Sequence, residues 1–185
     1  LRNLRNLGVE ATIVSFVGDD QAGEKIKQDL RKKSFSLNHI IQSQSSITTE
    51  KMRIVAEGQQ LVRVDWDTSN LSDQILNQVL KHSSRIIPEV DGVIISDYGK
   101  GVCSELVISG IIAKAKELKT PIFIDPKGKN WNKYYGASII TPNLKEAEIV
   151  VERQLKNDDD IEKAGLEICK SFSLNACLIT RGPKG

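Results

Sequence analysis

Short apolar runs alternate with amphipathic stretches through the second half of the chain. Residues 93–95, 122–124 and 177–179 are apolar at every position, as is typical of parallel strands that are buried on both faces. Residues 104–119 and 158–172 between them carry apolar side chains at helical spacing. The alternation predicts an α/β fold, a Rossmann-type parallel sheet flanked by helices with right-handed crossovers.

The same reasoning divides the rest of the chain into elements. In the first half of the chain, we expect the end of a helix at 1–7 capped by Gly8, a strand at 10–17, a helix at 21–33 and a strand at 37–42. A hairpin of 47–56 and 61–66 follows, and then a helix at 71–87 that Pro88 terminates. In the second half, we expect strands at 92–96, 121–125, 137–141 and 176–180, and a helix at 143–152. The helix end at residue 1 suggests that a strand of the same fold precedes it.

The hairpin is too polar for a core strand. Its first half carries Thr48, Thr49, Glu50, Lys51 and Arg53. Two interpretations stay open: an exposed edge hairpin without a role, and a lid that projects from the core.

Two turns at strand ends suit anionic ligands. Asn143 is a typical N-cap residue, and Glu146 three positions later can complete a capping box. Anions bind at such helix N-termini when these lie at the carboxyl ends of strands. Residues 180–185 form a second turn, whose glycines let backbone amides approach a phosphate. The nucleotide-binding candidates are Asn143, Lys145, Glu146, Thr180, Gly182 and Gly185, and the plainer alternative is a well-capped surface helix.

Charged side chains follow two other strands. Asp97 and Lys100 come after one, and Asp125 and Lys127 after the next, so we expect all four at the carboxyl edge of the sheet. A carboxylate there can bind sugar hydroxyls, and a lysine can bind a phosphate as a point charge.

The ordered motifs resemble a known family. Asn-x-x-Glu at 143–146, Thr-x-Gly-x-x-Gly at 180–185 and Val-Gly-x-Asp-x-x-Gly at 17–23 are similar to segments of ribokinase-like (PfkB-type) carbohydrate kinases. Three further segments, at 51–54 with 59–65, at 96–101 and at 124–128, resemble the D-glycero-β-D-manno-heptose 7-phosphate kinases. These kinases occur alone or as the kinase half of bifunctional ADP-heptose synthases.

The resemblance implies an activity and its cofactors. A member of this group uses ATP and Mg²⁺ to phosphorylate heptose 7-phosphate at O1, giving the 1,7-bisphosphate for ADP-heptose and lipopolysaccharide core synthesis. Glu146 would contact Mg²⁺ through water, because Mg²⁺ dehydrates reluctantly. Arg53, Asp97, Lys100, Asp125 and Lys127 would bind the sugar phosphate. Residues 47–66 would be the lid and the homodimer contact, and a nucleotidyltransferase domain could be fused in the full-length protein.

One family segment is not found in the chain. The Gly-Ala/Thr-Gly-Asp segment that supplies the anion hole and the catalytic base is expected beyond Gly185. The N-terminal strand is expected before Leu1. We therefore expect residues 1–185 to be an internal fragment of one kinase domain, without a catalytic residue of its own. Another PfkB-type sugar or nucleoside kinase, and a non-catalytic sugar- or nucleotide-binding module, remain alternatives.

Composition excludes several other classes. The net charge is +2 with scattered basic residues, which argues against nucleic acid. No run approaches the roughly 18 apolar residues of a membrane span. The three cysteines form no C-x-x-C pair and the two histidines lie far from them in sequence, so we expect reduced thiols, a cytoplasmic protein and no zinc site.

Overall fold

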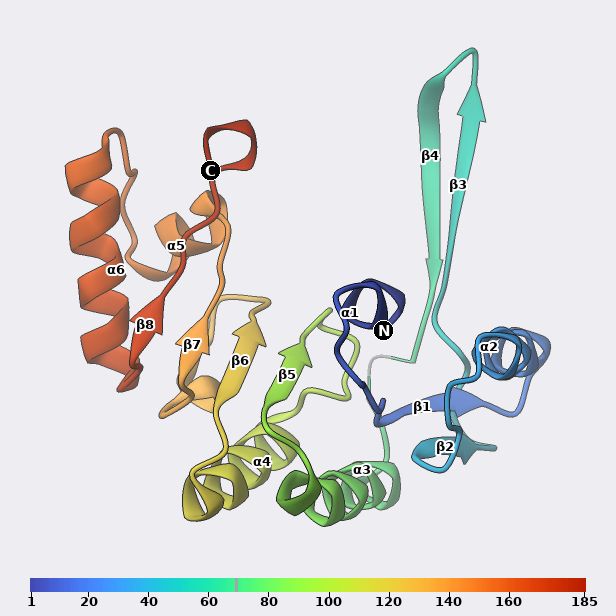
Figure 1. The fold of residues 1–185 in the computed structure, drawn as a ribbon. Coiled ribbons are helices and arrows are strands. Elements are labelled where there is room, and N and C mark those ends of the chain that lie inside the picture. The colour runs from blue at the N-terminus through green and yellow to red at the C-terminus, as the bar shows by residue number, and fades with distance from the viewer. Residues whose placement is uncertain (69) are drawn as a thin grey trace. The chain divides into compact units, whose positions relative to one another are not determined.

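The computed structural model of the protein describes residues 1–68 and 70–185 (Figure 1). It consists of two compact units. The first contains residues 1–82 with 100–102, and the second contains residues 83–99 with 103–185.

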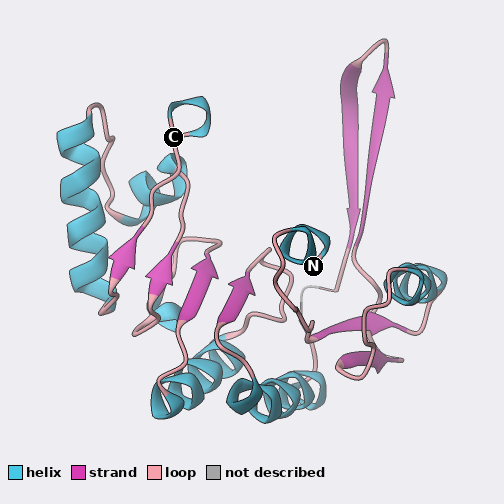
Figure 2. Ribbon diagram, viewed as in Figure 1, coloured by secondary structure: helices cyan, strands magenta, loops and turns pink. Residues whose placement is uncertain are grey.

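The second unit is built on a four-stranded parallel sheet (Figure 2). Its strands, in spatial order, are β5 Val93–Ser96, β6 Ile122–Asp125, β7 Ile139–Ile140 and β8 Ala176–Cys177. Ile124 pairs with Ile95 on one side and with Ile140 on the other. Both Ile124 and Ile140 are fully buried, as expected for apolar runs in a sheet covered on both faces. The predicted parallel α/β architecture is therefore confirmed.

Helices and single 3₁₀ turns lie before, between and after these strands in the chain. They are α4 Glu105–Leu118, α5 Leu144–Val150, α6 Asp158–Phe172, η1 Ile87–Glu89, η2 Asn132–Tyr134 and η3 Gly182–Lys184. The α4 helix begins where Ser104 accepts a hydrogen bond from the Val107 amide at 3.3 Å. The α6 helix begins where Asn157 accepts one from the Asp160 amide at 2.8 Å. Such caps satisfy amides that have no partner inside the helix.

The first unit holds a shorter parallel pair and the hairpin. Its elements are α1 Arg2–Asn6, β1 Ser15–Gly18, α2 Gln21–Lys32, β2 Ile40–Ser43, β3 Glu50–Ala56 and β4 Gln59–Trp66, followed by α3 Asp73–Ile86, which continues into the second unit. The strand expected at 10–17 was predicted too long, since β1 starts only at Ser15. The partner strand β2 pairs with β1 only from Ile40 onward, opposite Ser15. A strand is stable in a sheet only where a neighbouring strand provides hydrogen bonds.

The turn between β1 and α2 is a buried hydrogen-bonded network. The Asp20 carboxylate accepts hydrogen bonds from the Gly23 and Thr48 amides, both at 2.7 Å. Thr48 Oγ1 accepts one from the Gly18 amide at 2.8 Å. A Cβ on Gly18 would lie 2.6 Å from the Ser46 carbonyl oxygen. Glycine is therefore required here, and the motif at 17–23 has a structural reason.

The hairpin projects from the first unit (Figure 1). Every residue of β3 is exposed, including Lys51 and Arg53. The two-residue turn has positive φ at both Glu57 and Gly58, 50° and 79°, which matches the right-handed twist of hairpin strands. The hairpin is therefore exposed and projecting, as predicted, and its role as a lid stays a prediction.

Candidate functional site

A cavity of about 280 Å³ opens in the second unit, where β5, β6 and β7 end. It is lined by Asp97, Tyr98, Asp125, Pro126, Lys127, Thr141, Asn143, Glu146 and Thr180. Ligands of open α/β sheets bind at this edge. Six of the lining residues, Asp97, Asp125, Lys127, Asn143, Glu146 and Thr180, were predicted site residues from four separate strand exits.

The two turns predicted to bind phosphate meet in this cavity. Asn143 Oδ1 accepts a hydrogen bond from the Glu146 amide, and Glu146 Oε2 accepts one from the Asn143 amide, both at 3.0 Å. The predicted capping box is therefore present. Thr180 pairs with Asn143 in a parallel bridge, and the Leu144 amide donates to the Thr180 carbonyl oxygen at 3.0 Å. The capping box uses the Asn143 and Glu146 amides, so these two donors are already engaged.

An ion pair crosses the cavity. Lys127 Nζ donates to Glu146 Oε1 at 2.9 Å. The lysine side chain is 54% exposed and the carboxylate 12% exposed. The hydrogen bond to Glu146 and the charge of that carboxylate raise the pKa of Lys127. Lys127 is therefore a firmly charged, accessible cation at the end of β6.

Asp125 shares the electrostatics of this pair. Burial, followed by the negative charge of Glu146, raises the pKa of the Asp125 carboxyl. Ser96 Oγ donates to Asp125 Oδ2 at 3.5 Å and acts in the opposite direction. Two carboxylates that repel each other make the cavity receptive to a cation.

These carboxylates bear on the expected magnesium ion. Within residues 1–68 and 70–185, no three His, Cys, Asp or Glu side chains cluster as a metal site. Mg²⁺ in phosphoryl-transfer sites needs only one or two carboxylates, with substrate phosphates and water as its other ligands. Asp125 and Glu146 fit that pattern, although Lys127 already holds one oxygen of Glu146.

Asp97 is held inside the protein. It is 4% exposed, and its Oδ2 accepts hydrogen bonds from Lys133 Nζ at 2.5 Å and from the Tyr134 hydroxyl at 2.7 Å. Its Oδ1 accepts from the Gly99 amide at 2.6 Å. Tyr134 in turn accepts from the Lys127 amide at 3.0 Å. Asp97 therefore links the loop after β5 to the loop after β6. Its contact with a sugar stays a prediction.

Lys133 and Tyr134 were absent from the predicted site residues. They contact Asp97 across 36 and 37 residues, and neither belongs to a motif. Burial raises the pKa of the Tyr134 hydroxyl most, and the Asp97 carboxylate raises it further. No local sequence signal indicates such a contact.

The remaining predicted residues lie outside the cavity lining. Gly182 and Gly185 follow Thr180 with φ of 62° and 101°, and Lys145 is exposed on α5. Lys100 and Arg53 belong to the first unit, where Lys100 pairs with Asp67 and lies 3.9 Å from Asp65. The roles of these five residues stay predictions.

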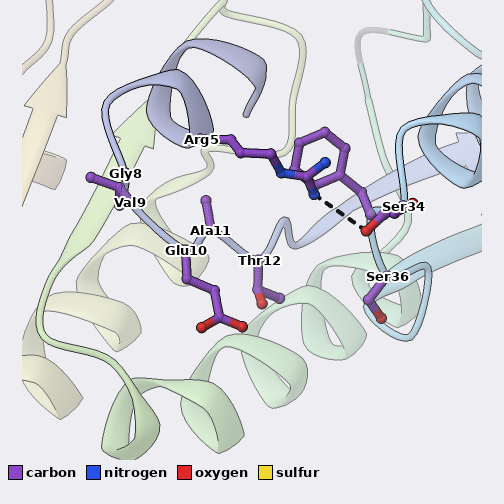
Figure 3. Close-up of a pocket in the computed structure, with 9 residues that line it drawn as sticks. Arg5, Gly8, Val9, Glu10, Ala11, Thr12, Ser34 and Ser36 are labelled. Carbon is purple, nitrogen blue, oxygen red and sulfur yellow. Dashed lines mark hydrogen bonds between the residues drawn. The ribbon is translucent and has the colours of Figure 1, made fainter.

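A larger cavity, of about 530 Å³, lies in the first unit (Figure 3). None of the predicted site residues lines it. Arg5 lines this cavity. Its guanidinium donates to the Ser34 carbonyl oxygen at 3.2 Å and stacks 3.7 Å from the centroid of the Phe35 ring. The smaller cavity therefore remains the candidate site, because it gathers the charged groups.

Other features bear on location and redox state. Among the described residues, no helix combines the length and apolarity needed to cross a bilayer. Cys103, Cys169 and Cys177 are free thiols.

Comparison with known proteins agrees with the fold. A model of the pfkB family carbohydrate kinases matches residues 1–185. Bifunctional protein HldE of Helicobacter hepaticus is 33% identical over 186 residues, which cover 100% of this chain and 39% of that protein. HldE of Vibrio vulnificus strain CMCP6 is 37% identical over 184 residues, 99% of this chain and 37% of that protein.

A solved structure shares the architecture. Phosphofructokinase-2 from Escherichia coli, in complex with fructose-6-phosphate, superposes with a TM-score of 0.74 at 21% identity and covers 100% of this chain and 61% of its own. At that identity the likeness shows the fold alone. The chain spans 39% and 37% of the two curated relatives.

Proposed function

The chain belongs to the pfkB family of carbohydrate kinases, and from this premise we propose that it is part of an ATP-dependent heptose 7-phosphate kinase. The observation that carries the proposal is the cavity, in which Asp125, Lys127, Asn143, Glu146 and Thr180 come together from separate strand exits. The heptose specificity rests on the resemblance of residues 51–65, 96–101 and 124–128. The product is the 1,7-bisphosphate.

Each residue has a role that suits phosphoryl transfer, which depends on positioning and charge neutralisation. Thr180 and Asn143 donate from their side chains to nucleotide phosphates. Lys127 exchanges its bond with Glu146 for an oxygen of the sugar phosphate and so neutralises charge on that substrate. Asp125 accepts hydrogen bonds from sugar hydroxyls. Magnesium, held by Glu146 and Asp125 through water, would supply further charge neutralisation.

The catalytic base is proposed to come from outside residues 1–185. The three carboxylates that line the cavity already have partners in the protein: Asp97 holds Lys133 and Tyr134, and Glu146 holds Lys127 and the Asn143 amide. Asp125 accepts a hydrogen bond from Ser96 Oγ at 3.5 Å. The shorter span of this chain relative to its relatives leaves room for the segment that carries the base. A fused nucleotidyltransferase and a cytoplasmic location are part of the same proposal.

The lid is proposed to form a homodimer contact. Met52 and Ile54 on β3 pair with Val64 and Val62 on β4, which places all four side chains on one face of the hairpin. Met52 and Ile54 are 51% and 46% exposed. An apolar strip on a projecting ribbon would be covered by the same strip of a second copy.

A coupled assay tests the function. A protein that carries this chain and continues beyond Gly185 should convert heptose 7-phosphate and ATP to ADP and the bisphosphate. Residues 1–185 alone should be slower by on the order of 10²- to 10⁴-fold, since they lack the base. Preference for fructose 6-phosphate or a nucleoside would instead identify another PfkB-type kinase. Ligand binding without turnover by the longer protein would identify a binding module.

A further inference from the structure

The fold brings the chain's two histidines together. His39, in the loop before β2, and His82, in α3, are 43 residues apart in sequence, yet their Nδ1 atoms lie 3.1 Å apart. The ring centroids are separated by 5.3 Å and the ring planes cross at 78°. Both residues belong to the first unit and are only partly buried, so the pair can be reached from solvent.

We propose that His39 and His82 form a binding site for a divalent transition metal that prefers nitrogen ligands, such as Zn²⁺ or Cu²⁺. A tetrahedral ion bound about 2.0–2.1 Å from each of two imidazole nitrogens holds them roughly 3.3 Å apart. The observed separation of 3.1 Å is within a few tenths of an ångström of that value. Small ring rotations then suffice to bring both nitrogens onto one ion.

The metal would take the place of a shared proton. In the hydrogen-bonded pair, one Nδ1 carries the hydrogen and the other accepts it. When a metal ion binds both Nδ1 atoms, the hydrogen of the donor ring moves to its Nε2, so both rings stay neutral. Because the described residues contain no cluster of three His, Cys, Asp or Glu side chains, water completes the coordination sphere. The site is therefore open and weaker than a closed structural zinc site.

The chain's thiols compete poorly for such an ion. A thiol binds metal as the thiolate, and burial raises the pKa of Cys177 to about 12. Burial, together with the charge of Asp97, raises the pKa of Cys103 to about 12 as well. Burial raises the pKa of Cys169 too. The two imidazoles are therefore the donors that suit Zn²⁺ or Cu²⁺, whereas Mg²⁺ prefers oxygen ligands and would not compete.

Metal titration of the untagged 185-residue chain tests the site, because every imidazole signal comes from these two residues. Zn²⁺ should bind with one-to-one stoichiometry by calorimetry. His39→Gln and His82→Gln should each weaken binding by at least about tenfold, since each removes one of two tethered ligands. Lys81→Gln is the matched control on α3, because it changes a neighbouring side chain and leaves both rings in place. It should bind like the parent chain.

Spectroscopy of the parent chain tests the site even if the glutamine variants fold poorly. In the parent chain, both imidazole proton resonances should shift or broaden with Zn²⁺, and Cu²⁺ should show hyperfine coupling to two nitrogens. Undiminished Zn²⁺ binding in both glutamine variants would overturn the proposal. So would a thiolate charge-transfer band with Co²⁺, or Zn²⁺ titration that leaves both imidazole resonances unchanged.

Discussion

Lys127 Nζ lies 2.9 Å from Glu146 Oε1 and so joins the end of β6 to the first turn of α5 across the candidate cavity. The same carboxylate closes the capping box through its other oxygen. One side chain thus fixes a helix end and holds a lysine in place. A phosphate that enters the cavity competes with Glu146 for that lysine.

Lys127→Ala should impair use of the sugar phosphate more than use of ATP. A charge-assisted hydrogen bond contributes about 1.5–3 kcal/mol, so KM for the sugar phosphate should rise on the order of 10- to 100-fold. KM for ATP should change by less. Steady-state kinetics of an active protein that carries this chain measure both constants. Lys163→Ala, on the exposed face of α6, is the control, and equal effects on both substrates would contradict the assignment.

Glu146→Gln should lower turnover and raise the Mg²⁺ concentration needed for half-maximal rate. The amide oxygen of glutamine can still accept from the Asn143 amide, so the helix cap should survive. The lost charge also weakens the hydrogen bond and removes the charge attraction by which Glu146 raises the pKa of Lys127. Measuring the rate at increasing Mg²⁺ concentration tests the metal contact, and thermal unfolding tests whether the change weakens the helix cap. A variant with normal magnesium dependence but lower stability would assign Glu146 to capping alone.

Asp97→Ala should destabilise the second unit. The change leaves the Lys133 ammonium, 20% exposed, and the Tyr134 hydroxyl without their shared acceptor. Removing one partner of a buried pair costs about 3–5 kcal/mol; the partial exposure of Lys133 argues for the lower end. Urea unfolding measures the loss, and Asp159→Ala, at an 82% exposed carboxylate, should cost far less. A loss of activity without a loss of stability would instead indicate direct substrate binding by Asp97.

Asp20 should contribute to an acid-sensitive stability of the first unit. Burial acts to raise its pKa, but hydrogen bonds from the Thr48 and Gly23 amides outweigh burial and lower it. A lowered pKa in the folded state adds stability above the unfolded value, about 3.9. That stability disappears as pH falls through the folded pKa. Asp20→Asn should therefore flatten the fall in unfolding free energy below about pH 4, and an unchanged slope would contradict this.

Ile54→Asp should dissociate a lid-mediated homodimer. The charge enters the apolar strip beside Met52, where a second copy would pack. Val55→Asp is the matched control, because Val55 is 57% exposed and pairs with Gln60, beyond the irregularity that follows Ile54, so it is not part of the apolar strip. Sedimentation velocity should show a dimer for the parent and for Val55→Asp, and a monomer for Ile54→Asp. Equal dissociation by both changes would argue against the strip.

The sequence alone determined the features that depend on neighbouring residues. The predicted bounds of α6 at 158–172 match the structure, and the capping box of Asn143 and Glu146 was predicted from its three-residue spacing. The parallel arrangement of the strands in the second half was predicted from their continuous apolar runs. These signals are local, because helix periodicity and capping act over three or four residues.

The tertiary structure decided the rest. The start of β1 at Ser15 depends on where β2 offers partners. Asp97 meets Lys133 and Tyr134, and His39 meets His82, only because the chain folds back over 36 to 43 residues. No periodicity encodes such contacts, since they arise from the packing of whole elements. The sequence thus identified which side chains follow the strands, and the fold selected which of them share a cavity.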